Sequence, residues 1–196
     1  MEEIYSVGGR LDVVLTLPDG QATDKSGRVY PDNFCQEHEV PLIKCRSIDD
    51  ETAINSVKDR QLDWLFVIGW SQIVGPEMLA APTQGCIGMH PTLLPEGRGR
   101  ASIPWAILRG LKSSGVTMFR LDEGVDTGDI LGQVAFPLSE NSTATDVYGK
   151  VLDAHRQLIR DHWEALACGL LKGVPQDSAA ATYWPGRRPE DGEILR

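Results

Sequence analysis

No apolar run in the sequence reaches the roughly 20 residues that a membrane-spanning helix needs, and the N-terminus has no signal-peptide pattern. We therefore expect a soluble, cytoplasmic protein with no membrane partner. Basic side chains are scarce as well, because 19 Lys and Arg stand against 28 Asp and Glu and give a formal net charge of −9. A general nucleic-acid surface needs clustered Lys and Arg, so we expect no nucleic-acid partner.

Cysteine and histidine are also too few and too scattered to indicate a metal site. Cys35, Cys45, Cys86 and Cys168 have no CxxC spacing and no histidines at zinc-ligand spacing, so we interpret them as reduced structural thiols. Two further histidines, at 155 and 162, lie on one face of a predicted helix without an acidic or thiol partner at usable spacing. The sequence therefore predicts no metal.

The sequence does contain a regular alternation of strand-like and helix-like segments. Its 196 residues with 41% apolar content suffice for one sizeable α/β core. Strand-like runs at 11–17, 40–45, 63–69, 86–89 and 132–138 alternate with helical patterns, which predicts a doubly wound, mainly parallel sheet with right-handed crossovers. Run 63–69 is the most apolar, as expected for a strand covered on both faces.

Several polar residues are candidate helix N-caps. Asp32 precedes a short helix at 34–38, and Ser47 or Asp49 precedes a helix that reaches Leu62. Thr143 or Thr145 precedes a long helix with apolar residues at helical spacing. We expect its buried stripe to comprise Val147, Val151, Leu158, Ile159 and Leu166. A predicted helix at 103–111 carries Trp105, which we interpret as a core residue, with a substrate platform as the alternative.

The most informative histidine is His90, which follows the β-prone run 86–89. Pro91 has no N–H to donate and ends the strand there. His90 therefore sits at the carboxyl end of a strand, where open α/β sheets place their ligands. A structural histidine is the alternative interpretation.

A second stretch, 115–131, carries an acidic loop. Asp122, Glu123, Asp126 and Asp129 lie there among glycines. Carboxylates so close together repel one another unless they are solvated or paired, and one of them could orient the imidazole or share its proton. A solvated acidic turn is the alternative.

Together these two stretches resemble the folate-dependent formyltransferase family, which has a His-Pro-Ser-Leu-Leu-Pro run, an Arg-Gly-rich loop, a Gly-Val-Thr strand and a Val-Asp-x-Gly loop. The matching segments are His90–Pro95 (HPTLLP), Arg98–Arg100 (RGR), Gly115–Thr117 (GVT) and Val125–Gly128 (VDTG). The resemblance implies a Rossmann-like catalytic core in residues 1–174, followed by a C-terminal loop and tail in 175–196. The family's first strand has no counterpart, so the start is either truncated or rearranged.

The resemblance also implies 10-formyltetrahydrofolate as cosubstrate, without a metal. His90 would polarise the formyl oxygen and assist proton transfer, while Asp126 would hold the imidazole and accept the proton. Gly88 stands where the family has its catalytic asparagine, so a backbone N–H, a water or Gln72 would have to replace that oxyanion donor. The implied folate-binding residues are Trp70, Ser71, Gln72, Ile73, Val74, Asp122 and Val125. The alternative for 70–74 is a simple turn with Trp70 half-buried.

The acceptor implied is the primary amine of a small anionic molecule, most simply a nucleotide-linked amino sugar. Arg187 and Arg188 could bind a diphosphate bidentately, in a tail without regular elements that could equally be solvated. Thr92, Arg98 and Arg100 complete the implied substrate-binding set. A hydrolase that releases formate from the same cosubstrate, or a catalytically impaired folate- or nucleotide-binding relative, are alternatives, and a homodimer stays open.

Overall fold

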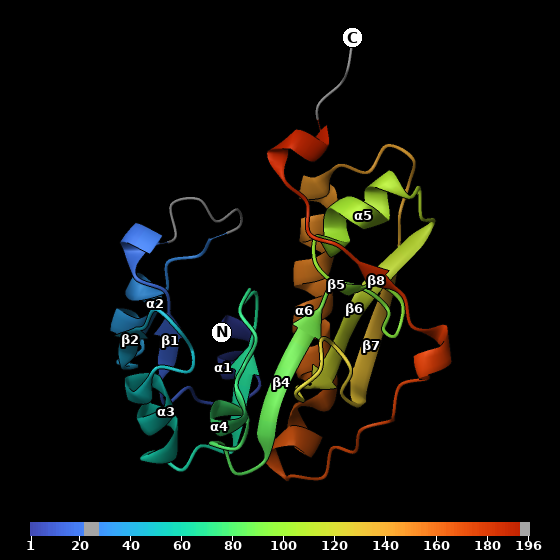
Figure 1. The fold of residues 1–196 in the computed structure, drawn as a ribbon. Coiled ribbons are helices and arrows are strands. Elements are labelled where there is room, and N and C mark those ends of the chain that lie inside the picture. The colour runs from blue at the N-terminus through green and yellow to red at the C-terminus, as the bar shows by residue number, and fades with distance from the viewer. Residues whose placement is uncertain (22–27, 193–196) are drawn as a thin grey trace. The chain divides into compact units, whose positions relative to one another are not determined.

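The computed structural model describes residues 1–21 and 28–192, apart from the side chains at 189 and 192. The chain forms two compact units, Met1–Cys86 and Ile87–Arg196, whose elements are labelled in Figure 1. The last part of the predicted tail, 193–196, lies outside the described residues.

The first unit is built around a pair of short parallel strands. β1 and β2 pair with Val14 opposite Leu42, and the apolar face of α3 supplies the fully buried Ala53 and Val57. The elements are α1 (Glu2–Ser6), β1 (Val14–Thr16), the 3₁₀ turn η1 (Asp19–Gln21), α2 (Asp32–Glu37), β2 (Leu42–Lys44), α3 (Glu51–Lys58), β3 (Trp64–Val67) and α4 (Pro76–Leu79). The predicted strands at 11–17, 40–45 and 63–69 are present in shortened form.

Helix starts in this unit differ from the predicted caps. Asp32 is the first residue of α2 rather than its cap, and its carboxylate lies 2.8 Å from Lys44 Nζ. That pairing lowers the pKa of Asp32. α3 begins after Asp50, while Asp49 accepts the Gly75 N–H at 2.8 Å. Both carboxylates are therefore engaged by partners far away in the sequence and do not cap a helix. The local sequence around each residue does not reveal these partners.

The second unit contains an antiparallel sheet in the order β4-β6-β7. Its strands are β4 (Gly85–His90), β6 (Ser113–Arg120) and β7 (Ile130–Pro137), its helices α5 (Ser102–Leu108) and α6 (Ala144–Ala167), and β5 (Arg98–Gly99) pairs in parallel with β8 (Tyr183–Trp184). The 3₁₀ turns η2 (Ser178–Ala180) and η3 (Pro189–Gly192) flank β8. The expectation of a tail without regular elements is thus wrong, because β8 depends on a partner far away in the sequence.

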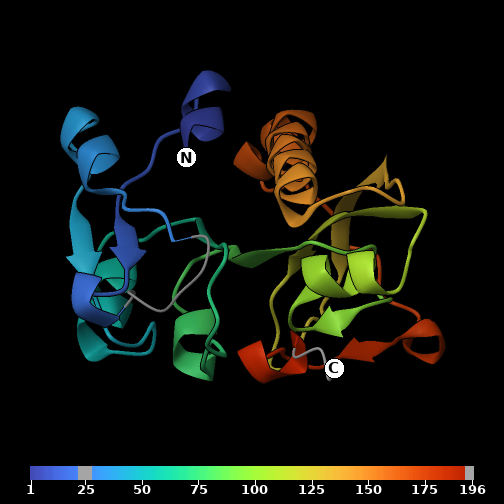
Figure 2. The ribbon, with the colours of Figure 1, turned by 90° about the horizontal axis from the view of Figure 1, so that it is seen from above.

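Helix α6 covers β6 and β7 and also contacts α5, as Figures 1 and 2 show. Thr143 is its N-cap and forms a capping box with Asp146, which lowers the pKa of the Asp146 carboxyl through hydrogen bonds from Thr143. All five residues of the predicted stripe are buried. A Cβ at Gly132 of β7 would overlap the ring of His162, so this glycine permits the close approach of α6 to the sheet.

The sequence predicted a doubly wound, mainly parallel α/β sheet, and this α/β class is confirmed. Parallel pairing occurs for β1–β2 and β5–β8, whereas β6 and β7 run antiparallel, because the loop 121–129 is too short to carry a parallel crossover. The four cysteines are free and three of them are buried. Burial raises the pKa of Cys86 to about 12, which makes its thiol unreactive. Within 1–21 and 28–192, no helix has the length and apolar character of a membrane span.

The packing of His155 on α6 predicts a pH dependence of stability. Its Nδ1 lies 2.7 Å from the carbonyl oxygen of Val151, and burial lowers the pKa of His155 despite that hydrogen bond. The unfolded chain keeps the ordinary value of 6.5 and binds the proton more readily, so stability is lost as pH falls below about 6.5 towards the folded pKa. We expect His155→Gln to reduce the slope of unfolding free energy between about pH 7 and 5, measured by urea denaturation; an unchanged slope would contradict this.

Candidate active site

The carboxyl end of β4 places His90 in a fixed orientation. The strand is buried from Cys86 onwards, and His90 pairs with Thr117 of β6. Its Nε2 lies 2.8 Å from the carbonyl oxygen of Gly97. A carbonyl only accepts, so Nε2 carries a proton, and in the neutral ring Nδ1 is an acceptor.

Asp126 faces that second nitrogen. Its Oδ2 lies 3.6 Å from His90 Nδ1, and the two side chains are 18% and 10% exposed. The same Oδ2 accepts the Gly99 N–H at 2.8 Å. Asp126 has a φ of 56°, a left-handed conformation that is costly for a residue with a Cβ. The strained backbone thus directs one carboxylate of the acidic loop towards the imidazole.

The distance between the two groups has a chemical consequence. At 3.6 Å the contact exceeds a direct hydrogen bond, and with neutral His90 two acceptors face each other. The arrangement is stable with an imidazolium, or with a proton-donating group that lies beside the pair and donates hydrogen bonds to both Nδ1 and Oδ2. An incoming amine or a water molecule has the chemistry to occupy that position.

Gly88 lies on the same strand, opposite Phe119 of β6. A Cβ at Gly88 would lie 2.8 Å from Phe119 Cε1 and 2.8 Å from Leu121 Cδ2. Phe119 is only 2% exposed. An apolar ring therefore occupies the space that an asparagine at position 88 would enter. The residues around position 88 thus fit a glycine and leave no room for the asparagine that the family carries.

The loop after His90 is held by two polar residues that the sequence did not single out. Thr117 Oγ1 donates to the Thr92 carbonyl at 2.7 Å and accepts the Leu94 N–H at 2.9 Å. Gln133 Nε2 donates to the Leu94 carbonyl and to Thr117 Oγ1, each at 2.8 Å. Thr117 lies within the Gly-Val-Thr segment, which the sequence analysis did identify. For Gln133, the sequence indicated only that the residue lies in a strand, and nothing pointed to its role in holding this loop.

Two of the predicted substrate-binding residues are buried in the second unit. Arg98 and Thr92 are each 2% exposed. Arg98 donates to Gln176 and to the Tyr183 hydroxyl, so its guanidinium serves the fold and is turned away from solvent. Thr92 packs near position 97, where its methyl group would lie 2.9 Å from an added Cβ. The role of Thr92 and Arg98 in substrate binding stays a prediction.

The predicted Arg187 and Arg188 follow β8 in the chain and lie near α5, together with Arg109, which the sequence did not single out. Arg187 stacks on the Trp105 ring with its Cζ 5.0 Å from the centroid, and Arg109 lies 5.5 Å from the same centroid. Arg188 is exposed, and its N–H donates to Asp191 at 2.6 Å. Trp105 is half-buried and donates to the Pro185 carbonyl at 2.8 Å. The indole is thus partly buried, and two arginine side chains, Arg109 and Arg187, lie over its ring.

The predicted folate-binding residues are divided between the units. In the second unit, Asp122 accepts the Thr127 hydroxyl at 2.6 Å and the Gly124 N–H at 3.1 Å, and Val125 is 46% exposed. In the first unit, Gln72 donates to the Arg46 carbonyl at 3.0 Å. Trp70 is half-buried, Ser71 and Ile73 are exposed and Val74 is buried. The role of 70–74 in folate binding stays a prediction.

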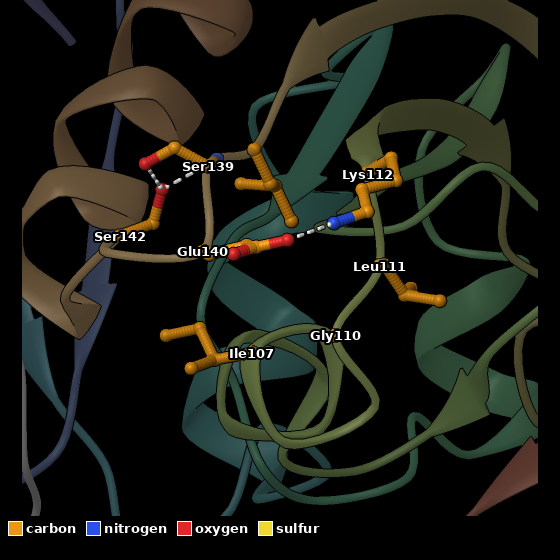
Figure 3. A pocket seen from close by; sticks show the side chains of 8 residues that line it. Ile107, Gly110, Leu111, Lys112, Ser139, Glu140 and Ser142 are labelled. Carbon is orange, nitrogen blue, oxygen red and sulfur yellow. Dashed lines mark hydrogen bonds and ion pairs between the residues drawn. The ribbon is translucent and has the colours of Figure 1, made fainter.

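A separate hollow of about 210 Å³ is lined by α5, the loop that follows it and the loop between β7 and α6 (Figure 3). It is bridged by the ion pair between Lys112 Nζ and Glu140 Oε1, 2.8 Å apart. None of the candidate residues lines it. Among residues 1–21 and 28–192, no group of three or more His, Cys, Asp or Glu side chains could hold a metal ion.

The fold and the site together define an α/β protein in which the His90 imidazole and the Asp126 carboxylate lie 3.6 Å apart. The chain belongs to the formyl transferase family, whose model, described as "Formyl transferase", matches residues 9–162.

Relatives and solved structures support that membership. The chain is 32% identical to the methionyl-tRNA formyltransferase of Geobacillus thermodenitrificans over 196 residues, which cover 99% of this chain and 61% of the relative. It thus spans about three-fifths of the curated relatives it matches. Phosphoribosylglycinamide formyltransferase of Streptococcus pneumoniae has a TM-score of 0.71 at 23% identity, covering 85% of this chain and 92% of that one.

A third similar structure is a formyltransferase from Anoxybacillus kamchatkensis in complex with UDP-4,6-dideoxy-4-formamido-L-AltNAc and tetrahydrofolate. It has a TM-score of 0.66 at 22% identity and covers 88% of this chain and 85% of that one. At this identity the likeness shows the fold alone. The names of these proteins differ in the molecule that receives the formyl group.

Proposed function

We propose that the chain transfers a formyl group from 10-formyltetrahydrofolate to the primary amine of a small anionic acceptor. The observation that carries the proposal is the approach of Asp126 Oδ2 to His90 Nδ1 at 3.6 Å, with His90 Nε2 already bonded to Gly97. In this reaction a C–N bond to the amine forms as the bond to the folate nitrogen breaks, and one proton passes from the amine to that nitrogen.

The hydrogen bond from Nε2 decides which ring atom of His90 acts. Since Nε2–H is engaged by the Gly97 carbonyl, only Nδ1 is available to the reacting atoms. His90 polarises the formyl oxygen when Nδ1 is protonated, and the adjacent Asp126 carboxylate stabilises that imidazolium. Nδ1–H then supplies the proton to the leaving nitrogen.

Asp126 takes the other half of the proton transfer. The amine loses its proton, directly or through a water molecule, to Oδ2, which the Gly99 N–H keeps oriented. That proton returns to His90 Nδ1 and restores the starting state, so the protons balance over one cycle. A positioned acid/base pair of this kind contributes about 10²–10⁴-fold in rate.

The acceptor is inferred from the charged surface next to the site. Gly99, which binds Asp126, is followed by Arg100, and β5 pairs with β8, whose chain continues to Arg187 and Arg188. These arginines form a local cationic surface on a chain with a net charge of −9. Guanidinium groups pair bidentately with phosphate, which supports an acceptor with a phosphate or diphosphate group, such as a nucleotide-linked amino sugar.

Activity assays decide among the acceptors. The purified chain is incubated with 10-formyltetrahydrofolate and, in parallel, a nucleotide-linked amino sugar, a phosphorylated ribosyl amine, charged methionyl-tRNA or no amine. We expect formylation of a small anionic amine. Formate release without any amine would support a hydrolase, and absence of both turnover and folate binding by calorimetry would contradict the proposal.

The cationic surface gives a separate prediction for acceptor binding. We expect Arg187→Ala with Arg188→Ala to raise the KM for the anionic acceptor about 10- to 100-fold, because a hydrogen bond to a charged group contributes about 1.5–3 kcal/mol. The kcat should change little, and the difference should shrink at high salt. Arg156→Ala on α6, where the arginine pairs with Asp153, removes the same charge elsewhere. An equal KM increase in this control would contradict a specific role.

A further inference from the structure

Gln176 links the two stretches of chain that hold the site. Its Oε1 accepts from Arg98 Nη2 at 2.7 Å and from Arg98 Nε at 3.2 Å. Its Nε2 donates to the carbonyl oxygens of Asp126 at 2.9 Å and Gly128 at 2.7 Å. Arginine only donates and carbonyls only accept, so the chemistry of the partners fixes the orientation of the amide. Its four hydrogen-bonding positions are all occupied.

The segment that carries Gln176 is itself anchored. After α6, Val174 forms an isolated bridge with Ile130 at the start of β7, through two hydrogen bonds of 2.8 Å. At Gly173 an added Cβ would overlap the side chain of Asp129. The chain therefore runs directly beside the end of the acidic loop. The bridge at Val174 fixes the position of the segment, so that Gln176 lies beside the backbone of Asp126.

Arg98 is anchored on the other side. It is buried, its Nη1 donates to the Tyr183 hydroxyl at 2.9 Å, and its backbone N–H donates to the Thr182 carbonyl at 2.9 Å. Its neighbour Gly99 donates to Asp126 Oδ2. The backbone of Asp126 is thus tied to Arg98 through Gln176, while its carboxylate is tied to the next residue along the same strand.

These two ties act on a strained residue. Asp126 has a φ of 56°, a conformation that costs of order 1–3 kcal/mol for a residue other than glycine and persists only where surrounding contacts enforce it. Without the Gln176 donors, the carbonyls of Asp126 and Gly128 lose these partners and the loop can relax. A rotation about the Asp126 backbone would carry Oδ2 away from His90 Nδ1.

We infer that Gln176 is a positioning residue for the proposed transfer reaction, which holds the Asp126 carboxylate against His90 without touching either substrate. The inference rests on the proposed function. Gln176 follows α6, whereas His90 lies in β4 and Asp126 lies in the loop between β6 and β7, so the inference links three separate parts of the chain.

The first test removes the hydrogen bonds that Gln176 Nε2 donates and keeps those that Gln176 Oε1 accepts. Gln176→Glu keeps the size of the side chain and the contacts to Arg98, but it places a carboxylate oxygen against the two carbonyls. We expect kcat to fall about 10²-fold, the cost of a misplacement of roughly 1 Å in a catalytic geometry, with the KM of both substrates within about twofold of wild type. Gln157→Glu, on the exposed side of α6, adds the same charge as a control and should behave as wild type.

A double-mutant cycle tests whether Gln176 acts through Asp126. If it does, Gln176→Ala lowers kcat in the wild-type background and has almost no further effect in the Asp126→Asn background. An equal loss in both backgrounds, a loss seen in KM alone, or a wild-type kcat for Gln176→Glu would each overturn the inference. Circular dichroism and Tm identify any variant that has lost its fold.

A measurement without turnover separates this inference from the proposed function. We expect the Gly99 amide, which donates to Asp126 Oδ2 at 2.8 Å, to exchange its hydrogen faster in Gln176→Ala, as it does in Asp126→Ala, and at the wild-type rate in Gln157→Ala. Protection that is lost in Asp126→Ala and kept in Gln176→Ala would overturn the inference whatever the activity. Absence of formyl transfer in the wild type, with the protection changing as expected, would reject the proposed function alone.

Discussion

Asp126→Asn is expected to lower the rate of formyl transfer by about 10²–10⁴-fold, the range of a positioned acid/base group. The amide keeps the shape of the side chain, and its oxygen still accepts the Gly99 N–H. It neither stabilises the His90 imidazolium nor accepts the proton of the amine. His90→Ala removes the other member and should cost a similar factor. Steady-state kcat with saturating cosubstrate and acceptor measures both effects.

The acidic loop supplies a matched control for this experiment. Glu123 lies in the same loop and is exposed, so Glu123→Gln removes an equal charge without touching the His90 pair. It should keep wild-type kcat and Tm. If Glu123→Gln lowers kcat as much as Asp126→Asn, the effect is the charge of the loop as a whole, and the specific role of Asp126 is lost. A His90→Ala variant with unchanged turnover would remove the acid/base mechanism.

Gly88→Asn is expected to destabilise the protein by about 1–3 kcal/mol, the usual cost of overpacking a core, without raising kcat. The new side chain would enter the space of the Phe119 ring, which an added Cβ already meets at 2.8 Å. Restoring the residue that the family carries therefore does not restore a donor at this site. Urea denaturation gives the stability change and initial rates give kcat.

Position 149 offers the control for that substitution. An added Cβ at Gly149, on α6, meets nothing within 4 Å, so Gly149→Asn makes the same chemical change in open space and should be close to neutral. Combining Gly88→Asn with Phe119→Ala makes room for the amide. We expect the combined loss of stability to be smaller than the sum of the two single losses, because the residues are in contact. A single Gly88→Asn variant with unchanged stability and a higher kcat would contradict the packing argument.

Local sequence was sufficient for the elements whose signals are local. A helix cap and a helical apolar stripe are encoded within a few residues of one another, so α6 was predicted with its buried face and with Thr143 as one of two candidate caps. A histidine followed by proline marked the end of β4 for the same reason. The predicted helix caps in the first unit were wrong, because Asp32 pairs with Lys44 and Asp49 accepts a hydrogen bond from Gly75.

The candidate site was predictable only in part. The sequence indicated His90 and an acidic loop as candidate site elements, and the resemblance to the family indicated Asp126 within that loop. It placed Arg98 among the substrate-binding residues, but the guanidinium is buried and donates to Gln176, 78 residues away. It did not single out Gln176, since a lone glutamine after a helix carries no pattern.

By itself, the sequence determined the α/β class, the family and the strand end at which His90 stands, because periodicity, strand-ending residues and motif order are properties of the chain read along its length. Only the tertiary structure decided that Phe119 fills the space beside Gly88, that Arg98 turns inward and that Gln176 holds the backbone of Asp126. Each of those outcomes depends on side chains from segments far apart in sequence competing for the same volume and the same hydrogen-bonding groups, and that competition exists only once the chain has folded.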